Sequence, residues 1–216
     1  SKVVTTNRPN AAVVPDDAPE FVRHVTAKMI AGRGDELPVS AIPADGTYPS
    51  GTSRWEKRNI ADAVPVWSPH LCVQCGNCVM VCPHASIRAR LYDESLLADA
   101  PSRFASAPLA GRGFPGKRFT IQVAVEDCTG CELCVEACPV RSGGETAVRA
   151  LAMRPKDGEL VSAGRAHLAF FNSLPELTSA TVDPALVRGA QYLTPLFEYS
   201  GACAGCGETP YLKVLS

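Results

Sequence analysis

The chain has 216 residues, a formal net charge of −1, 46% hydrophobic residues and ten cysteines. This length is enough for one or two domains, and the hydrophobic fraction is enough for a buried core. Lys and Arg are scattered, so we expect neither a nucleic-acid nor a membrane partner. No apolar run is long enough to span a membrane, and the first residues lack the order of a signal peptide. Free cysteines in such a chain are typical of a reducing cytoplasm, so we expect a cytoplasmic protein.

Residues 1–66 are predicted to be irregular, extended chain with one helix. Asp16 or Asp17 can cap a helix that ends at Gly32. Its apolar residues are four positions apart, which predicts one buried face made of Phe21, Val25 and Met29. Prolines and glycines dominate the rest of this region. We expect it to be ordered because it has large apolar side chains to bury, namely Tyr48, Trp55 and Ile60.

Two cysteine runs follow, and both have the form C-x2-C-x2-C-x3-C-P. This is the spacing of bacterial two-cluster ferredoxins, in which the fourth cysteine of each run ligates the cluster of the other run. We therefore predict two [4Fe–4S] clusters with crossed ligands. The ligands of the first cluster would be Cys72, Cys75, Cys78 and Cys138. The ligands of the second cluster would be Cys128, Cys131, Cys134 and Cys82.

Other interpretations of the cysteines are weaker. A zinc site usually takes two C-x2-C pairs, so each run has more cysteines than one tetrahedral ion needs. A disulfide framework would need an oxidising compartment and is typical of shorter chains. His70 and His84 flank the first run, but eight cysteines already satisfy two clusters, so we expect both to serve packing or backbone hydrogen bonds. Trp67 and Met80 are expected in the core.

The elements around the two runs are predicted from periodicity. We expect a helix over 91–98, a loop over 100–118, and a strand over 119–125, where apolar and polar residues alternate. A second strand is expected over 147–153, and a short helix over 166–173. Because the two runs form an internal repeat, the predicted fold class is α+β: a ferredoxin-like two-cluster domain with a pseudo-two-fold repeat, flanked by irregular extended segments.

One glycine-rich loop has part of the pattern of a phosphate-binding loop. Residues 111–116 satisfy the G-x-G-x-x-G pattern, and Lys117 follows them. Phosphate binding by such loops requires a helix N-terminus, whereas this loop precedes a strand and has Arg118 where a Ser or Thr is needed. A basic surface loop is therefore the favoured interpretation.

The stretch GTSRWEKRNI, at residues 51–60, resembles the "EKR" region of pyruvate:ferredoxin (flavodoxin) oxidoreductases. The resemblance also covers residues 37–40, both cysteine runs and the strand at 119–123, and it ends at PLFEYSGACAGCGETP, residues 195–210. It implies an enzyme that oxidises pyruvate with coenzyme A to acetyl-CoA and carbon dioxide. Thiamine diphosphate with magnesium would do the carbon chemistry, and three [4Fe–4S] clusters would pass electrons to ferredoxin or flavodoxin. A homodimer is implied for the whole enzyme.

The same resemblance assigns roles near the C-terminus. Cys203 and Cys206 would be two ligands of the third cluster, and Glu208 would contact thiamine diphosphate. From spacing alone, a single C-x2-C can equally be half a metal site, a redox pair or two unpaired thiols. The chain lacks an initial Met and stops within a motif, so we expect it to be a piece of a longer polypeptide. The implied parts are an EKR-type region and linker (1–66), the two-cluster domain (67–155), a connector (156–200), and the first strand and loop of a thiamine domain (201–216).

No pair of residues is predicted to act as catalytic acid and base. The predicted function is an electron relay within the longer enzyme, in which cysteines fix the clusters and apolar neighbours exclude water. We expect those neighbours to be Val73, Val79, Val81, Leu133 and Val135. The alternative is a stand-alone ferredoxin-type carrier subunit, which would have no use for the third C-x2-C.

Overall fold

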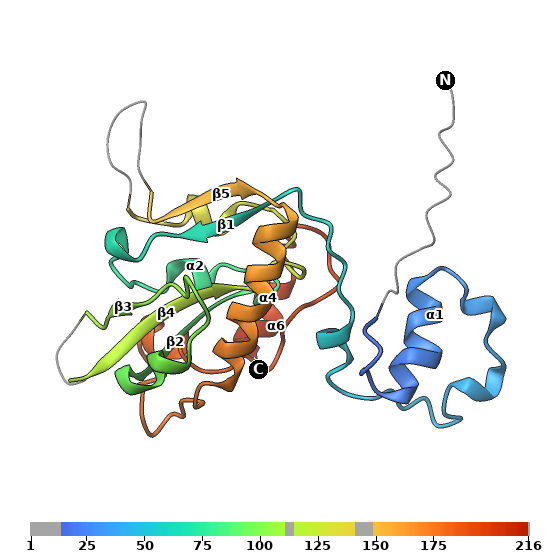
Figure 1. Ribbon diagram of the computed structural model, residues 1–216. Coiled ribbons are helices and arrows are strands. Elements are labelled where there is room, and N and C mark those ends of the chain that lie inside the picture. Colours follow the sequence, from blue (N-terminus) through green and yellow to red (C-terminus); the bar gives the residue numbers. More distant parts are fainter. Residues whose placement is uncertain (1–13, 111–114, 141–148, 216) are drawn as a thin grey trace. The chain divides into compact units, whose positions relative to one another are not determined.

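The computed structural model describes residues 14–110, 115–140 and 149–215 (Figure 1). It contains two compact units, Ser1–Lys57 and Arg58–Ser216. Both helices and strands are present, and the second unit contains all five strands of the described ranges. No helix in these ranges is long and apolar enough to cross a membrane.

The helix of the first unit starts later than predicted. Helical residues begin at Glu20, and a π-helical turn at Val22–Thr26 is followed by α1 at Ala27–Ile30. Its first backbone hydrogen bond runs from the Arg23 N–H to the Pro19 carbonyl. Asp16 and Asp17 lie in the turn before this proline, so the prediction that either caps the helix is wrong.

The end of this helix is as predicted. Gly32 has a φ of +71°, which glycine adopts without steric cost. Its N–H bonds to the Met29 carbonyl, and the Arg33 N–H bonds to the Lys28 carbonyl, at 3.1 and 2.9 Å. This pair of bonds is a Schellman motif, which satisfies the last carbonyls of the helix.

The buried face of this helix differs in part from the prediction. Val25 is buried and Phe21 is half-buried, but Met29 is about half exposed. A π-helical turn contains an extra residue, which rotates the turns that follow and moves Met29 off the buried face. Between Gly34 and Trp55 the described chain has three 3-10 turns, at Gly34–Glu36, Val39–Ala41 and Thr52–Trp55.

Of the three large side chains expected to be buried in residues 33–66, Trp55 is half-buried, whereas Tyr48 is 44% exposed although it makes local contacts. Trp55 packs against the small core of the first unit. The Tyr48 hydroxyl lies 2.8 Å from the Thr26 hydroxyl, and its ring meets that of Phe21 edge-on. Ile60, in the second unit, is half exposed, so the expectation that it is buried is wrong.

A three-stranded antiparallel sheet forms the centre of the second unit. Its order is β2 (Ile87–Asp93), β4 (Lys117–Val123) and β3 (Ala107–Pro108), with Leu91 opposite Phe119. The predicted strand at 119–125 is thus confirmed as β4. Residues 111–114 of the glycine-rich loop lie outside the described ranges, but the element that follows this loop is a strand, as expected. The predicted helix over 91–98 is wrong, because its first residues complete β2 and a 3-10 segment follows at Glu94–Asp99.

A second, two-stranded sheet pairs residues from opposite ends of the two-cluster region. β1 (Ala63–Trp67) and β5 (Leu151–Pro155) run antiparallel, with Trp67 opposite Leu151. β5 overlaps the predicted strand, whose residues 147 and 148 are not described. β1 was not predicted. Its Pro65 is tolerated because both strands of such a sheet are edges.

The longest helix, α4 (Gly158–Ser173), begins eight residues before the predicted one. The Asp157 side chain caps it by accepting a 2.8 Å hydrogen bond from the Leu160 N–H. The helix packs against β4 (Figure 1). Two shorter helices follow, α5 (Val187–Ala190) and α6 (Thr209–Leu215). The predicted first strand of a thiamine domain is wrong within residues 201–215, where α6 is the regular element.

The main core joins the sheets to the cysteine runs. Phe119 is fully buried, and its ring meets those of Trp67 and Tyr192 edge-on, with centroids 5.5 and 6.1 Å apart. Cys78, Cys82 and Cys134 belong to the same buried cluster. Trp67 is therefore in the core as predicted. Met80 is about half exposed, so its predicted core position is wrong.

Candidate metal centres

Each cysteine run folds into a loop followed by one helical turn. The turns are α2 (Asn77–Met80) after the first loop and α3 (Leu133–Glu136) after the second. The third and fifth positions of each run have positive φ, so the two loops repeat the same left-handed backbone steps. These residues are Gln74 and Gly76 in the first run and Gly130 and Glu132 in the second. Such steps curl the chain tightly enough for three cysteines to border one cavity.

The first cavity contains cysteines from both runs. It is lined by Cys72, Cys75 and Cys78 of the first run and by Cys138 of the second. The remaining wall is mainly apolar, and it includes Trp67, Val73, Ile121, Pro139, Val140, Ala150 and Leu151.

The second cavity has the reciprocal composition. It is lined by Cys128, Cys131 and Cys134 of the second run and by Cys82 of the first. Its wall is also more polar than that of the first cavity. It includes Ile87, Val123 and Met153 together with the polar residues His84, Ser86, Thr129 and Glu132.

Four of the thiols that line these cavities hold their protons tightly. Burial raises the pKa of Cys128 to about 11 and that of Cys134 to about 12. Burial also raises the pKa values of Cys78 and Cys72. Metal ligands are thiolates, so any metal that enters must displace these protons.

The donor sets suit a cluster better than a single ion. Within the described ranges, no three His, Cys, Asp or Glu side chains are close enough together to hold one metal ion. Yet each cavity has four cysteines on its wall. A four-iron cubane is larger than one ion, so its ligands stand farther apart, and four thiolates are the set it takes.

The expected water-excluding residues fall into two groups. Val79 and Val135 are buried beside the ligand loops, as predicted. Val81 is half-buried. Val73 and Leu133 line the first and second cavities but are 58% and 39% exposed, so that part of each side chain faces outward.

His84 makes the kind of contact predicted for it. Its buried ring places Nδ1 3.1 Å from the Ser200 hydroxyl and 3.2 Å from the Ser200 carbonyl oxygen. The Tyr199 N–H also donates to the His84 carbonyl at 2.8 Å. His84 thus ties the turn after Cys82 to the segment before the third C-x2-C. His70 is exposed.

The third C-x2-C lies beside the second cavity and outside both cysteine sets. Cys203 is exposed and Cys206 is half-buried. Gly205 between them approaches so closely that a Cβ there would lie 3.3 Å from the Cys131 Cβ. Backbone N–H groups of Thr209 and Glu208 lower the pKa of Cys206. Glu208 is exposed, immediately before α6.

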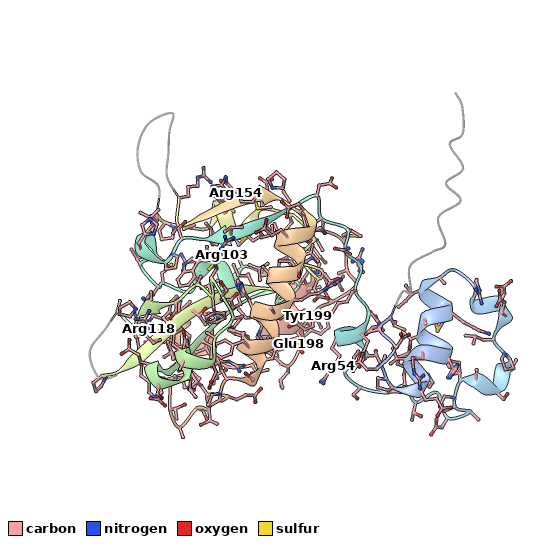
Figure 2. All side chains as sticks on the ribbon, in the orientation of Figure 1. Arg54, Arg103, Arg118, Arg154, Glu198 and Tyr199 are labelled. Carbon is pink, nitrogen blue, oxygen red and sulfur yellow. The ribbon has the colours of Figure 1, made fainter. Side chains whose placement is uncertain are left out.

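An ion pair ties the C-terminal segment to the sheet. Glu198, labelled in Figure 2, accepts a 2.6 Å hydrogen bond from Arg88 Nη1 of β2. Arg88 also borders a cavity of about 600 Å³, which is lined mainly by apolar side chains and by no cysteine. This cavity therefore offers no thiolate to a metal, unlike the two cavities that the cysteine runs line.

Comparisons with known proteins agree with this geometry. Residues 7–61 match the family named EKR, a domain of unknown function, and residues 71–142 match the 4Fe-4S dicluster domain. The chain is 50% identical over 204 residues to a putative pyruvate-flavodoxin oxidoreductase of Synechocystis sp.. This match covers 94% of the chain and 17% of the relative. It is 49% identical over 210 residues to a probable pyruvate-flavodoxin oxidoreductase of Escherichia coli. That match covers 97% of the chain and 18% of the relative.

A third relative carries a different acceptor in its name. The pyruvate:ferredoxin oxidoreductase of Moorella thermoacetica is 44% identical over 206 residues, covering 95% of the chain and 17% of that protein. The chain thus spans about one sixth of the length of these relatives. It corresponds to a segment of the pyruvate-flavodoxin oxidoreductases that contains a 4Fe-4S dicluster domain.

Proposed function

We propose that this chain is the electron relay of a pyruvate:ferredoxin or pyruvate:flavodoxin oxidoreductase. The observation that carries the proposal is the grouping of eight cysteines into two cavities, each with three from one run and one from the other. When bound there, [4Fe–4S] clusters supply one-electron transfer. The chain's own residues position the thiolates, surround them with apolar side chains and limit the access of water.

The ligand assignment follows from the cavity linings. Cys72, Cys75, Cys78 and Cys138 would hold the first cluster. Cys128, Cys131, Cys134 and Cys82 would hold the second. The matched left-handed positions of the two loops and the helical turn after each also support a pseudo-two-fold arrangement of the two halves.

A third cluster is part of the same proposal. Cys203 and Cys206 would supply two of its ligands, and the remaining thiolates would come from other residues of a longer polypeptide, because a cubane takes four. The close approach of Gly205 to Cys131 supports an order in which the third cluster is next to the second one. Glu208, beside this run, would contact thiamine diphosphate in the complete enzyme.

The partners are proposed from the relatives' names. Those names indicate pyruvate as the substrate and flavodoxin or ferredoxin as the electron acceptor. The rest of the enzyme and a second copy of it would be the structural partners. In such an enzyme, residues 1–66, 67–155, 156–200 and 201–216 would be the EKR region, the relay, a connector and the start of the thiamine domain. A stand-alone carrier is the alternative, and the position of the third C-x2-C beside the second cavity argues against it.

Metal analysis tests the relay. We expect the anaerobically reconstituted chain to bind about eight irons and eight sulfides, with the broad brown absorbance of [4Fe–4S] clusters. The reason is that each cavity supplies a full set of four thiolates. Stoichiometric zinc without sulfide, or about four irons per chain, would contradict the proposal.

Alkylation of the metal-free chain tests the thiol environments. The thiolate is the reactive form, so each cysteine should react faster with rising pH until the pH passes its pKa. We expect the rate at Cys206, whose pKa is lowered, to level off below pH 9, whereas the rate at Cys134 should still rise up to about pH 12. Iodoacetamide labelling mapped by mass spectrometry gives both profiles. In denaturant the two profiles should coincide near the ordinary thiol pKa, and coincidence in the folded chain would contradict the assignment.

A further inference from the structure

The second cavity has a hydroxyl group in contact with one of its cysteines. The Ser86 Oγ lies 3.4 Å from the Cys82 Sγ, and both side chains are buried. Hydrogen bonds to sulfur are longer than those between oxygen and nitrogen atoms, so this distance suits an O–H···S contact. Once Cys82 binds iron as a thiolate it has no proton to give, so Ser86 must be the donor.

The backbone holds Ser86 in this position. A tight turn joins it to the ligand, with the Ala85 N–H donating to the Cys82 carbonyl at 3.3 Å. Ala85 has a φ of +47°, an unusual value for alanine, which brings the chain back toward Cys82. The Ser86 carbonyl then accepts a 2.7 Å hydrogen bond from the Ala124 N–H, next to the end of β4. Ser86 is therefore fixed from both sides and is not a mobile surface hydroxyl.

A second hydroxyl lines the same cavity. The Thr129 Oγ1 is buried and has no hydrogen-bond partner among the residues that the structure describes. Thr129 directly follows Cys128 and is part of the cavity wall. A buried hydroxyl without a partner is costly, and sulfur atoms in this cavity would give it an acceptor.

We propose that Ser86 and Thr129 donate hydrogen bonds to the sulfur atoms around the second cluster and thereby raise its reduction potential. The proposal rests on the proposed function. Reduction adds one negative charge, which the sulfur atoms share, so donors aimed at them stabilise the reduced form more than the oxidised form. The hydroxyls keep their protons, and one electron from dithionite is the only species added.

The first cavity supplies a matched control. There the polar group is the Trp67 indole N–H, which is buried without a hydrogen-bond partner in the described ranges. Trp67 and Cys72 both line the first cavity, so a sulfur atom there would give the indole N–H an acceptor. Trp67→Phe should therefore act on the first cluster only.

The test is anaerobic potentiometry of the reconstituted chain, with reduction by dithionite followed by electron paramagnetic resonance. We expect Ser86→Ala to reduce the equilibrium constant for reduction of one cluster by about threefold to tenfold, where tenfold is about 59 mV for one electron. Thr129→Val should lower the reduction potential of the same cluster. Ser86→Thr keeps a hydroxyl, so both potentials should stay close to those of the wild type. Trp67→Phe should shift the reduction potential of the other cluster.

Iron and sulfide analysis distinguishes failure of the proposed function from failure of the tuning proposal. If the wild-type chain does not bind about eight irons, the proposed function fails. If it binds them and neither Ser86→Ala nor Thr129→Val lowers a potential, the tuning proposal is overturned. It is also overturned if Ser86→Ala and Trp67→Phe move the same cluster. Should Ser86→Ala lose its cluster, Thr129→Val decides the question alone.

Discussion

Cys82→Ala is expected to remove the cluster whose other three ligands come from the second run. The Cys82 side chain lines the cavity of Cys128, Cys131 and Cys134, although it lies only four residues after Cys78. A cubane that loses one of four thiolates is exposed to exchange and oxidation, so iron should fall from about eight to about four per chain. Anaerobic iron and sulfide analysis gives the count.

The identity of the surviving cluster is the decisive part of this experiment. In Cys82→Ala, alkylation should reach Cys128, Cys131 and Cys134, while Cys72 and Cys75 stay protected by their cluster. Cys138→Ala should give the reverse pattern, and Cys203→Ser should change neither, because Cys203 lies outside both cavities. Loss of protection at Cys72 and Cys75 in Cys82→Ala would show that ligation is not crossed.

Short-range patterns account for what the sequence predicted well. The spacing within each run leaves little freedom for the loop, and the alternation in residues 119–123 defines one strand of the sheet. The glycine that ends the first helix is needed for a local positive φ. Each of these features depends on residues within about ten positions, so no tertiary information is required.

β2 shows why other elements were missed. Its residues Arg88 and Arg90 are buried charges, which are normally evidence against a buried strand. The structure compensates Arg90 from far along the chain. Its Nη1 donates to the carbonyls of Phe171 and Leu174 at the end of α4, at 3.1 and 2.7 Å, and its guanidinium lies 4.6 Å from the centroid of the Phe171 ring. The compensating groups are more than 80 positions away, beyond the reach of any local pattern.

The start of α4 was missed for a different reason. A capping signal is present, since Asp157 precedes Gly158 and Glu159 and its side chain caps the helix. However, Gly158 and Gly164 both lower the intrinsic helix propensity of this segment. At Gly164 a Cβ would come within 2.9 Å of Val125, so close packing against the chain after β4 favours glycine there. Tertiary packing thus overrides local propensity.

The grouping of the eight cysteines around two cavities was predictable, but the surroundings of those cysteines were not. Spacing assigned each cysteine to a set, because the ligands repeat a known motif. No comparable pattern marked Ser86 or Thr129, whose significance depends on which sulfur they face. A serine four residues after the last cysteine of a run is a weak signal, and it becomes informative only once the turn at Ala85 places it against Cys82.

Phe119→Ala is expected to lower the free energy of unfolding strongly. The ring is fully buried in β4 and packs edge-on against Trp67, a wall of the first cavity, and against Tyr192. Removing it should cost about 3–5 kcal/mol through lost burial and an unfilled cavity, whereas Tyr211→Ala, at a ring that is 71% exposed, should cost less than about 0.5 kcal/mol. Anaerobic urea unfolding of the cluster-loaded chains at a fixed incubation time, followed by circular dichroism, compares the midpoints. Equal midpoints for the two variants would mean that Phe119 does not support the cluster-bearing core.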